Sequence, residues 1–122
     1  MPKILIVEDD PFLAEMYSTK INQEGFEVES AGDGKEAVEK ARSTNPDVIL
    51  LDIVLPKMDG FEVLQKIKKD PTLQHIKVIV LTNLGQKEEV EKGIELGADD
   101  YIVKAHFTPT EVVNKVKKIL SK

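Results

Sequence analysis

The feature that most constrains the fold is a short, wholly apolar run, Val48-Ile49-Leu50-Leu51, which is followed directly by Asp52. A strand that is apolar at every position is typical of a parallel sheet, because helices cover both faces of such a sheet. Ligands of these sheets bind outside the carboxyl ends of the strands, which is where Asp52 would lie. A second apolar run, residues 4–7, ends in Glu8-Asp9-Asp10. If the two strands are neighbours, several carboxylates converge on one crevice.

Short apolar runs alternate with segments of helical periodicity along the chain, which is typical of βαβ units. We therefore expect an α/β, doubly wound sandwich: a five-stranded parallel sheet with helices on both faces and right-handed crossovers. In the first helix, Leu13, Met16, Tyr17 and Ile21 are expected to face the sheet, and in the fourth helix Val90 and Ile94. The expected strands are 3–7, 27–30, 48–51, 77–81 and 101–103, and the clearest helices are 11–24, 86–96 and 109–120.

Capping signals mark the starts of the helices. Asp10 precedes Pro11, as an N-cap precedes a proline at the first helical position. Asp33, Asp59 and Thr108 each stand three residues before a glutamate, which is the pattern of a capping box. Asp10, Asp33 and Asp59 are therefore interpreted as helix caps rather than as parts of a reactive site.

Composition narrows the possible functions. The chain has 122 residues, a net charge of −5 and no cysteine. We expect one domain, 1–122, without disulfides, thiolate nucleophiles or cysteine-based zinc sites. The acidic balance argues against nucleic-acid binding through the whole surface. No apolar run is long enough to span a bilayer and no signal peptide is recognisable, so we expect no membrane contact and a cytoplasmic location.

The residues that follow the strands carry the chemistry. Glu8 and Asp9 follow the first strand, Asp52 the third, Thr82 the fourth and Lys104 the fifth. Carboxylates held a few ångströms apart repel unless a proton or a cation lies among them, and Mg²⁺ with oxygen ligands is the natural neutraliser. An aspartate beside Mg²⁺, a lysine and a hydroxyl is equipped to attack phosphorus.

These segments together resemble the receiver domain of two-component response regulators, such as chemotaxis regulators, over essentially the whole chain. The similar segments are 4–10, 52–60, 81–82 and 97–104. Their combination is far more specific than a single short motif. The resemblance implies a flavodoxin-like (βα)5 fold and a phosphorylation-activated signalling switch in a two-component phosphorelay.

The resemblance also implies roles for individual residues. Asp52 would be the phosphoacceptor, Lys104 would pair with the phosphoryl group, and Thr82 would be the switch hydroxyl that moves towards it. Tyr101 would change rotamer in step with Thr82. Such a domain is a phosphoprotein rather than an enzyme, with only self-directed phosphotransfer and autodephosphorylation.

The implied cofactor is Mg²⁺. Asp9 would bind it directly and Glu8 through water, and Asp52 and the main-chain carbonyl of Val54 would complete the protein ligands.

The implied partner is a sensor histidine kinase or a histidine phosphotransfer protein. Phosphorylation would alter the surface of the fourth helix, fifth strand and fifth helix, towards an unknown output partner, an excised output domain or a second copy in a phosphorylation-dependent dimer. No direct nucleic-acid binding by this domain is expected.

Because the chain stops just past the fifth helix, we expect a stand-alone receiver or a piece of a larger regulator. The lysines of the last two helices are interpreted as a solvated surface: Lys87, Lys92, Lys115, Lys117 and Lys118.

Two residues depart from the family pattern. Ala105 stands where the family usually has a proline after a cis bond, and a cis bond before any other residue costs ~2.5–4 kcal/mol. Asn83 stands where a small residue is usual, and its side chain could hinder access to the phosphoryl group or hydrogen-bond to it. The lifetime of the phosphoryl group and the geometry of the Lys104–Ala105 bond are therefore open.

Three alternatives compete with the switch. A phosphatase of the haloacid dehalogenase type needs a second aspartate two residues after the nucleophile, where this chain has Val54. A flavodoxin-like cofactor binder needs a phosphate-cradling loop after the first strand, where this chain has acids. A receiver that no longer takes phosphate is disfavoured because every charged residue of the site is present.

Overall fold

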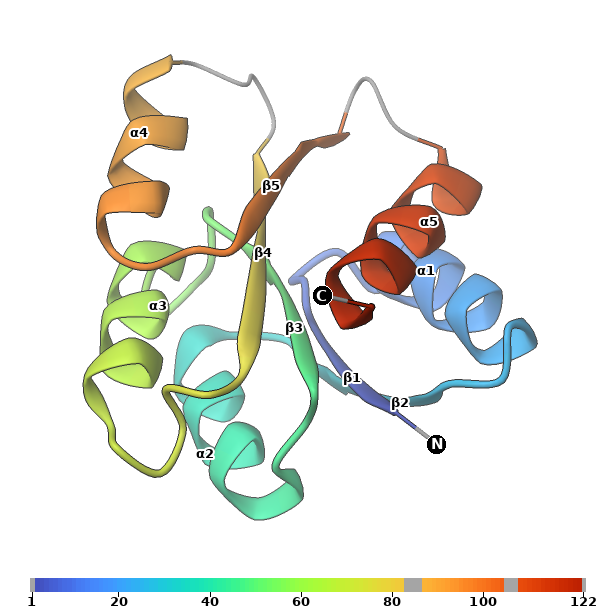
Figure 1. Ribbon diagram of the computed structural model, residues 1–122, viewed down its shortest axis with the longest axis horizontal. Helices are drawn as coiled ribbons and strands as arrows, with labels where there is room; N and C mark the ends of the chain where they lie inside the picture. Colours follow the sequence, from blue (N-terminus) through green and yellow to red (C-terminus); the bar gives the residue numbers. More distant parts are fainter. Residues whose placement is uncertain (1, 83–86, 105–107, 122) are drawn as a thin grey trace.

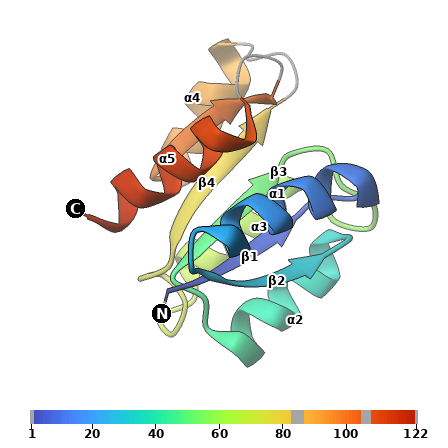
Figure 2. The same cartoon turned by 90° about the vertical axis from the view of Figure 1, so that its right-hand side faces the viewer.

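The computed structural model describes residues 2–82, 87–104 and 108–121. A five-stranded parallel sheet with strand order β2-β1-β3-β4-β5 lies between two helical layers (Figure 1). Figures 1 and 2 show α1 and α5 on one face of the sheet and α2, α3 and α4 on the other. The doubly wound α/β fold expected from the sequence is confirmed. The strands are β1 (Lys3–Val7), β2 (Glu27–Ala31), β3 (Val48–Asp52), β4 (Lys77–Thr82) and β5 (Asp100–Val103), and the helices are α1 (Pro11–Gln23), α2 (Gly34–Thr44), α3 (Gly60–Lys69), α4 (Lys87–Glu95) and α5 (Pro109–Leu120).

The central strands are apolar throughout because each face of the sheet has its own core. In β1, Ile4 and Ile6 pack in the core under α1 and α5, whereas Leu5 and Val7 pack in the core under α2 and α3. All four side chains are completely buried. Successive side chains of a strand point to opposite faces, so a strand between two cores has no polar position.

The expected helix caps are confirmed. The Asp10 carboxylate accepts hydrogen bonds from the first-turn N–H groups of α1, and Asp33 and Asp59 do the same for α2 and α3. Thr108 forms a reciprocal capping box with Glu111 at the start of α5. These aspartates are therefore committed to backbone N–H groups, as the sequence predicted.

Two expected inward residues are exposed. Ile94 of α4 is 53% exposed and Met16 of α1 is 37% exposed, so their predicted orientation is wrong. In α4 the buried residue is Gly93, whose missing side chain would point at Val80 of β4. Because α4 approaches the sheet through this glycine, the next residue is turned towards solvent. Leu96, just beyond the helix, packs against the core instead.

None of the described helices is long and apolar enough to cross a membrane.

Candidate functional site

The register of the sheet brings the predicted residues to the carboxyl ends of the strands, and β1, β3, β4 and β5 all run upwards in the view of Figure 1. Val7 of β1 pairs with Leu51 of β3, so the residues that follow them, Glu8 and Asp52, are neighbours. The same strand-by-strand pairing continues through β4 to β5. Thr82 ends β4, and Lys104 follows β5 directly. Four adjacent strand ends therefore supply the site.

Lys104 joins the two buried carboxylates. Its Nζ donates to Glu8 Oε2 at 2.6 Å and to Asp52 Oδ2 at 2.8 Å. Glu8 and Asp52 are each only 3% exposed. The second oxygen of Asp52 accepts a hydrogen bond from the backbone N–H of Val54 at 3.2 Å. Asp52 is thus oriented from both sides.

Burial and charge shift the protonation of this cluster. Burial, together with the neighbouring Asp52, raises the pKa of Glu8 to about 7, although Lys104 acts in the opposite direction. Burial by itself would lower the pKa of Lys104, but its bonds to Asp52 and Glu8 outweigh burial and raise that pKa. Near neutral pH the lysine is charged and Glu8 is close to its midpoint. While Glu8 carries its proton, the Lys104 ammonium needs to balance only the Asp52 carboxylate; once Glu8 is ionised, one buried negative charge is left over.

Asp9 extends the acidic cluster to the surface. One carboxylate oxygen from each of Glu8, Asp9 and Asp52 lies within 4.8 Å of the others. Asp9 is exposed, unlike its two partners, so the cluster is open to solvent. Because Lys104 offsets only one of three negative charges, this donor set fits a hard divalent cation with oxygen ligands. The cluster could therefore hold a metal ion.

Thr82 and Tyr101 lie in different surroundings. The Thr82 hydroxyl is buried and has no hydrogen-bond partner among the described residues. A buried hydroxyl without a partner is costly, so this atom is available for an acceptor that enters the site. Tyr101 is 39% exposed on β5 and is not brought into the site. Asn83, Ala105 and the Lys104–Ala105 bond lie outside the described residues.

Comparisons with known proteins decide the family. The family model of the response regulator receiver domain matches residues 4–117. The chain belongs to this family.

Several full-length relatives are regulators of transcription by their names. This receiver domain is 39% identical over 120 residues to the DNA-binding dual master transcriptional regulator RpaA of Synechocystis sp., covering 98% of this chain and 49% of that protein. It is 38% identical to the alkaline phosphatase synthesis transcriptional regulatory protein PhoP of Bacillus subtilis, covering 97% of this chain and 48% of that protein. The receiver domain thus spans about half the length of the curated relatives it matches.

Solved structures agree with the fold. A putative response regulator from Chloroflexus aurantiacus superposes with a TM-score of 0.92 at 34% identity, covering 99% of this chain and 98% of that chain. The chemotaxis protein CheY4 of Vibrio cholerae gives a TM-score of 0.90 at 31% identity, covering 97% of this chain and 98% of that chain. The BeF3-activated receiver domain of DrrB gives 0.88 at 35% identity, covering 100% and 99%.

Two structural contacts of this receiver domain escaped the sequence interpretation. Gly60, at the start of α3, packs so closely on the strand end that an added Cβ would lie 2.3 Å from the carbonyl oxygen of Asp52. The sequence favours a solvated Lys115, but its Nζ donates to both carboxylate oxygens of Asp100 at 3.0 Å. A glycine after a capping aspartate was a usable signal for the first contact. The second depends on how α5 lies against β5, which no local pattern encodes.

Proposed function

We propose that residues 1–122 form one phosphoacceptor domain that switches in a two-component phosphorelay. Asp52 takes a phosphoryl group from a phosphohistidine of a sensor kinase or histidine phosphotransfer protein. The observation that carries this proposal is the convergence of the buried Asp52 carboxylate with Lys104 and two further acids at one sheet edge. No second aspartate stands two residues after Asp52, so the chemistry is self-directed rather than that of a turnover enzyme.

The geometry favours an in-line attack by Asp52. A carboxylate oxygen of Asp52 forms a bond to phosphorus while the bond from phosphorus to the histidine nitrogen breaks, and the histidine leaves with the electron pair. The Val54 N–H and Lys104 already orient the two carboxylate oxygens. After transfer, Lys104 would pair with the phosphoryl oxygens, and the Thr82 hydroxyl would donate to one of them.

We propose Mg²⁺ as the cation of the acidic cluster. Asp9, Asp52 and the Val54 carbonyl would bind it directly, and Glu8 through water. When bound, Mg²⁺ supplies positive charge that offsets the carboxylates and the incoming phosphoryl group. The three clustered carboxylates support this assignment, because hard oxygen ligands are the ones that Mg²⁺ prefers.

The output of the switch would be the surface of α4, β5 and α5. A phosphoryl group adds charge and acceptor oxygens, so it can bias a two-state loop through local contacts. Thr82 would move towards the phosphoryl group and Tyr101 would change rotamer with it. An output partner, an output domain or a second copy would then respond to the altered surface. With a net charge of −5, we propose no direct contact of this domain with nucleic acid.

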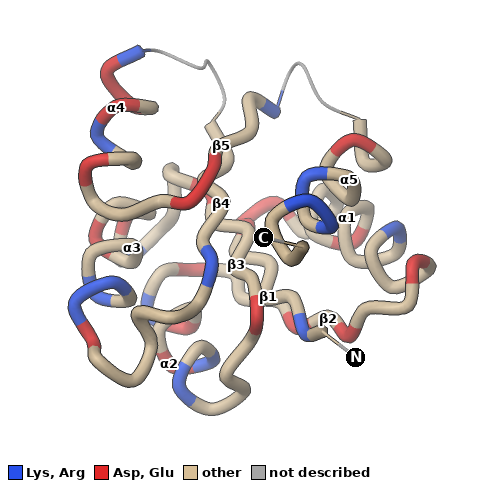
Figure 3. Tube along the Cα trace, in the orientation of Figure 1, with Lys and Arg blue, Asp and Glu red and all other residues tan. Residues whose placement is uncertain are grey.

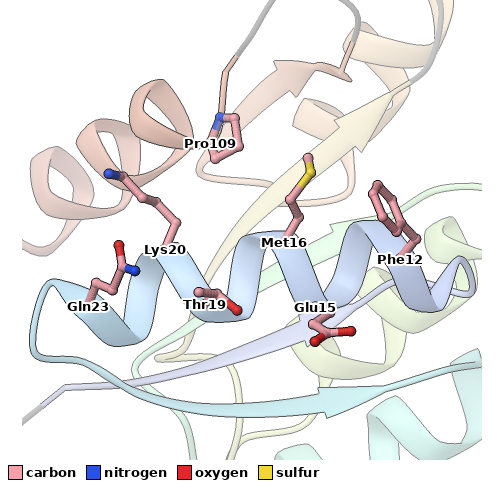
Figure 4. A pocket seen from close by; sticks show the side chains of 7 residues that line it. All are labelled: Phe12, Glu15, Met16, Thr19, Lys20, Gln23 and Pro109. Atoms are coloured by element: carbon pink, nitrogen blue, oxygen red, sulfur yellow. The ribbon is translucent and has the colours of Figure 1, made fainter.

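We propose that the domain works in the cytoplasm and that a groove on α1 binds the phosphodonor protein. Phe12 is 73% exposed, and it lines a groove of about 480 Å³ with Met16 and, across from α1, Pro109 (Figure 4). Phe12 lies in the first turn of α1, directly after the acidic residues that follow β1. A groove with an exposed aromatic side chain, three residues after Asp9 in the chain, suits a protein that must bring a phosphohistidine to Asp52.

Intact mass after incubation with acetyl phosphate tests the proposal. The wild-type protein should gain one acid-stable, base-labile phosphoryl group with Mg²⁺ and little without it. Asp52→Asn should gain none. Asp47→Asn is the matched control, because Asp47 precedes the same strand at its opposite end, and it should behave as wild type. Equal phosphorylation of Asp52→Asn would overturn the proposal, and steady release of phosphate from many esters would favour a phosphatase.

A further inference from the structure

Lys115 of α5 contacts two consecutive residues of β5. Its Nζ bonds Asp100 Oδ1 and Oδ2 at 3.0 Å each, and it lies 5.7 Å from the centre of the Tyr101 ring. Figure 3 shows the corresponding segments, the acidic start of β5 and the basic stretch of α5, near each other. Successive side chains of a strand point to opposite faces. Because β5 is an edge strand of the sheet, a lysine of α5 can lie near side chains of both faces.

Asp100 fixes the position of this ammonium. The side chains of Asp100 and Lys115 are each about one-quarter exposed. Asp100 Oδ1 also accepts a hydrogen bond from the backbone N–H of Tyr101 at 2.8 Å. The bidentate contact with Asp100 therefore holds the Lys115 ammonium near the ring of Tyr101. A cation over an aromatic face is attracted by the ring quadrupole, and partial removal from water strengthens the attraction.

We propose that Lys115 is a positioning residue that holds Tyr101 at the exposed edge of the sheet in the unphosphorylated protein. Tyr101 must leave this contact to change rotamer, so Lys115 sets how much phosphoryl analogue is needed to move it. This inference rests on the proposed function, in which Tyr101 responds to Asp52. It adds a residue of α5 to the switch, through a contact that the ring loses on activation.

Fluorine NMR can test the inference directly. The chain has two tyrosines and no tryptophan, so 3-fluorotyrosine labelling gives two resonances, which Tyr17→Phe assigns. In Lys115→Met, the Tyr101 resonance of the unphosphorylated protein should shift towards its position in wild type saturated with Mg²⁺ and beryllofluoride. The beryllofluoride concentration at half-conversion should fall about threefold or more. Lys118→Met, an exposed lysine of the same helix, should match wild type in both measurements.

Lys115→Arg keeps the cation and should restore the wild-type resonance, which separates lost charge from disturbed folding. The inference is overturned if Lys115→Met and Lys118→Met give the same Tyr101 resonance before beryllofluoride is added. If the Tyr101 resonance of the wild-type protein does not change with beryllofluoride, the proposed switch is overturned, and with it the role of Lys115 in setting the concentration of beryllofluoride that is needed. The comparison of the two variants without beryllofluoride would still decide whether Lys115 positions the ring.

Discussion

Glu8 is buried beside Asp52, and one lysine cannot neutralise both carboxylates. The pKa of Glu8 is therefore raised from 4.5 to about 7 in the folded protein, mainly by burial. Between these values the folded protein holds a proton that the unfolded chain has released. The contribution of Glu8 to the free energy of unfolding is thus fully present below about pH 4.5 and is lost as the pH rises through about 7.

Replacing Glu8 by glutamine should stabilise the metal-free protein at high pH. Glu8→Gln keeps the shape and an acceptor for Lys104 but removes the buried charge. We expect the free energy of unfolding at pH 8 to rise by about 1–3 kcal/mol, with a much smaller gain at pH 5. Urea denaturation in chelator at both pH values measures it. Glu95→Gln, at an exposed site on α4, is the control and should show no such difference. A loss of stability at both pH values would contradict the expected charge balance.

At the scale of the elements, the start of α3 sets the position of the phosphoacceptor. The Gly60 N–H donates to the carbonyl oxygen of Ile53 at 2.8 Å, and an added Cβ would lie 2.6 Å from the Cα of Ile53. Both neighbours are backbone, so neither can rotate away. The helix can approach the strand end only where residue 60 has no side chain.

Gly60→Ala should therefore displace the end of β3. We expect a loss of about 1–3 kcal/mol in the free energy of unfolding and at least about tenfold slower phosphorylation by acetyl phosphate. Gly32→Ala is the matched control, since no atom lies within 4 Å of its added Cβ, and it should stay near wild type. Denaturation and intact-mass time courses give the two readouts. An unchanged phosphorylation rate in Gly60→Ala would show that the helix start does not position Asp52.

Helix α1 has one face in the core and an exposed face that we propose for the phosphodonor protein. Phe12 is largely exposed, whereas Ile21 of the same helix is completely buried. Phe12→Ser should change the free energy of unfolding by less than about 0.5 kcal/mol, and Ile21→Ala should lower it by about 2–5 kcal/mol. Phe12→Ser should also keep wild-type phosphorylation by acetyl phosphate and lose about tenfold in the rate of transfer from a phosphorylated sensor kinase. Equal transfer rates for Phe12→Ser and the wild-type protein would show that the groove is not part of the donor interface.

The elements themselves were largely predictable. Strand β1 and helix α5 have the predicted bounds, and β3 extends by one residue, to Asp52 itself. Apolar runs and caps are local signals, and a parallel sheet aligns all strand ends, which is why the cluster of Glu8, Asp52 and Lys104 could be anticipated. The orientation of Ile94 could not, because it depends on Gly93 approaching a strand that is distant in sequence.

At the scale of the whole molecule, the sheet separates two apolar cores that share the strands β1, β3 and β4. The acidic cluster lies where two of these shared strands, β1 and β3, end, so its carboxylates come from segments that are distant in sequence and that only the folded sheet brings together. An unfolded chain cannot offer the three carboxylates at this spacing. A metal that binds them must therefore stabilise the folded domain as one unit.

Magnesium should accordingly raise the stability of the entire domain. At a concentration ten times its dissociation constant, Mg²⁺ is expected to add about 1.4 kcal/mol to the free energy of unfolding. The gain should be larger at pH 8 than at pH 6, because Glu8 must release its proton when the cation binds. Asp9→Asn should abolish most of the gain while leaving the metal-free stability nearly unchanged, since Asp9 is exposed. Denaturation curves with Mg²⁺ or chelator measure both effects, and an equal gain in Asp9→Asn would place the cation elsewhere on the protein.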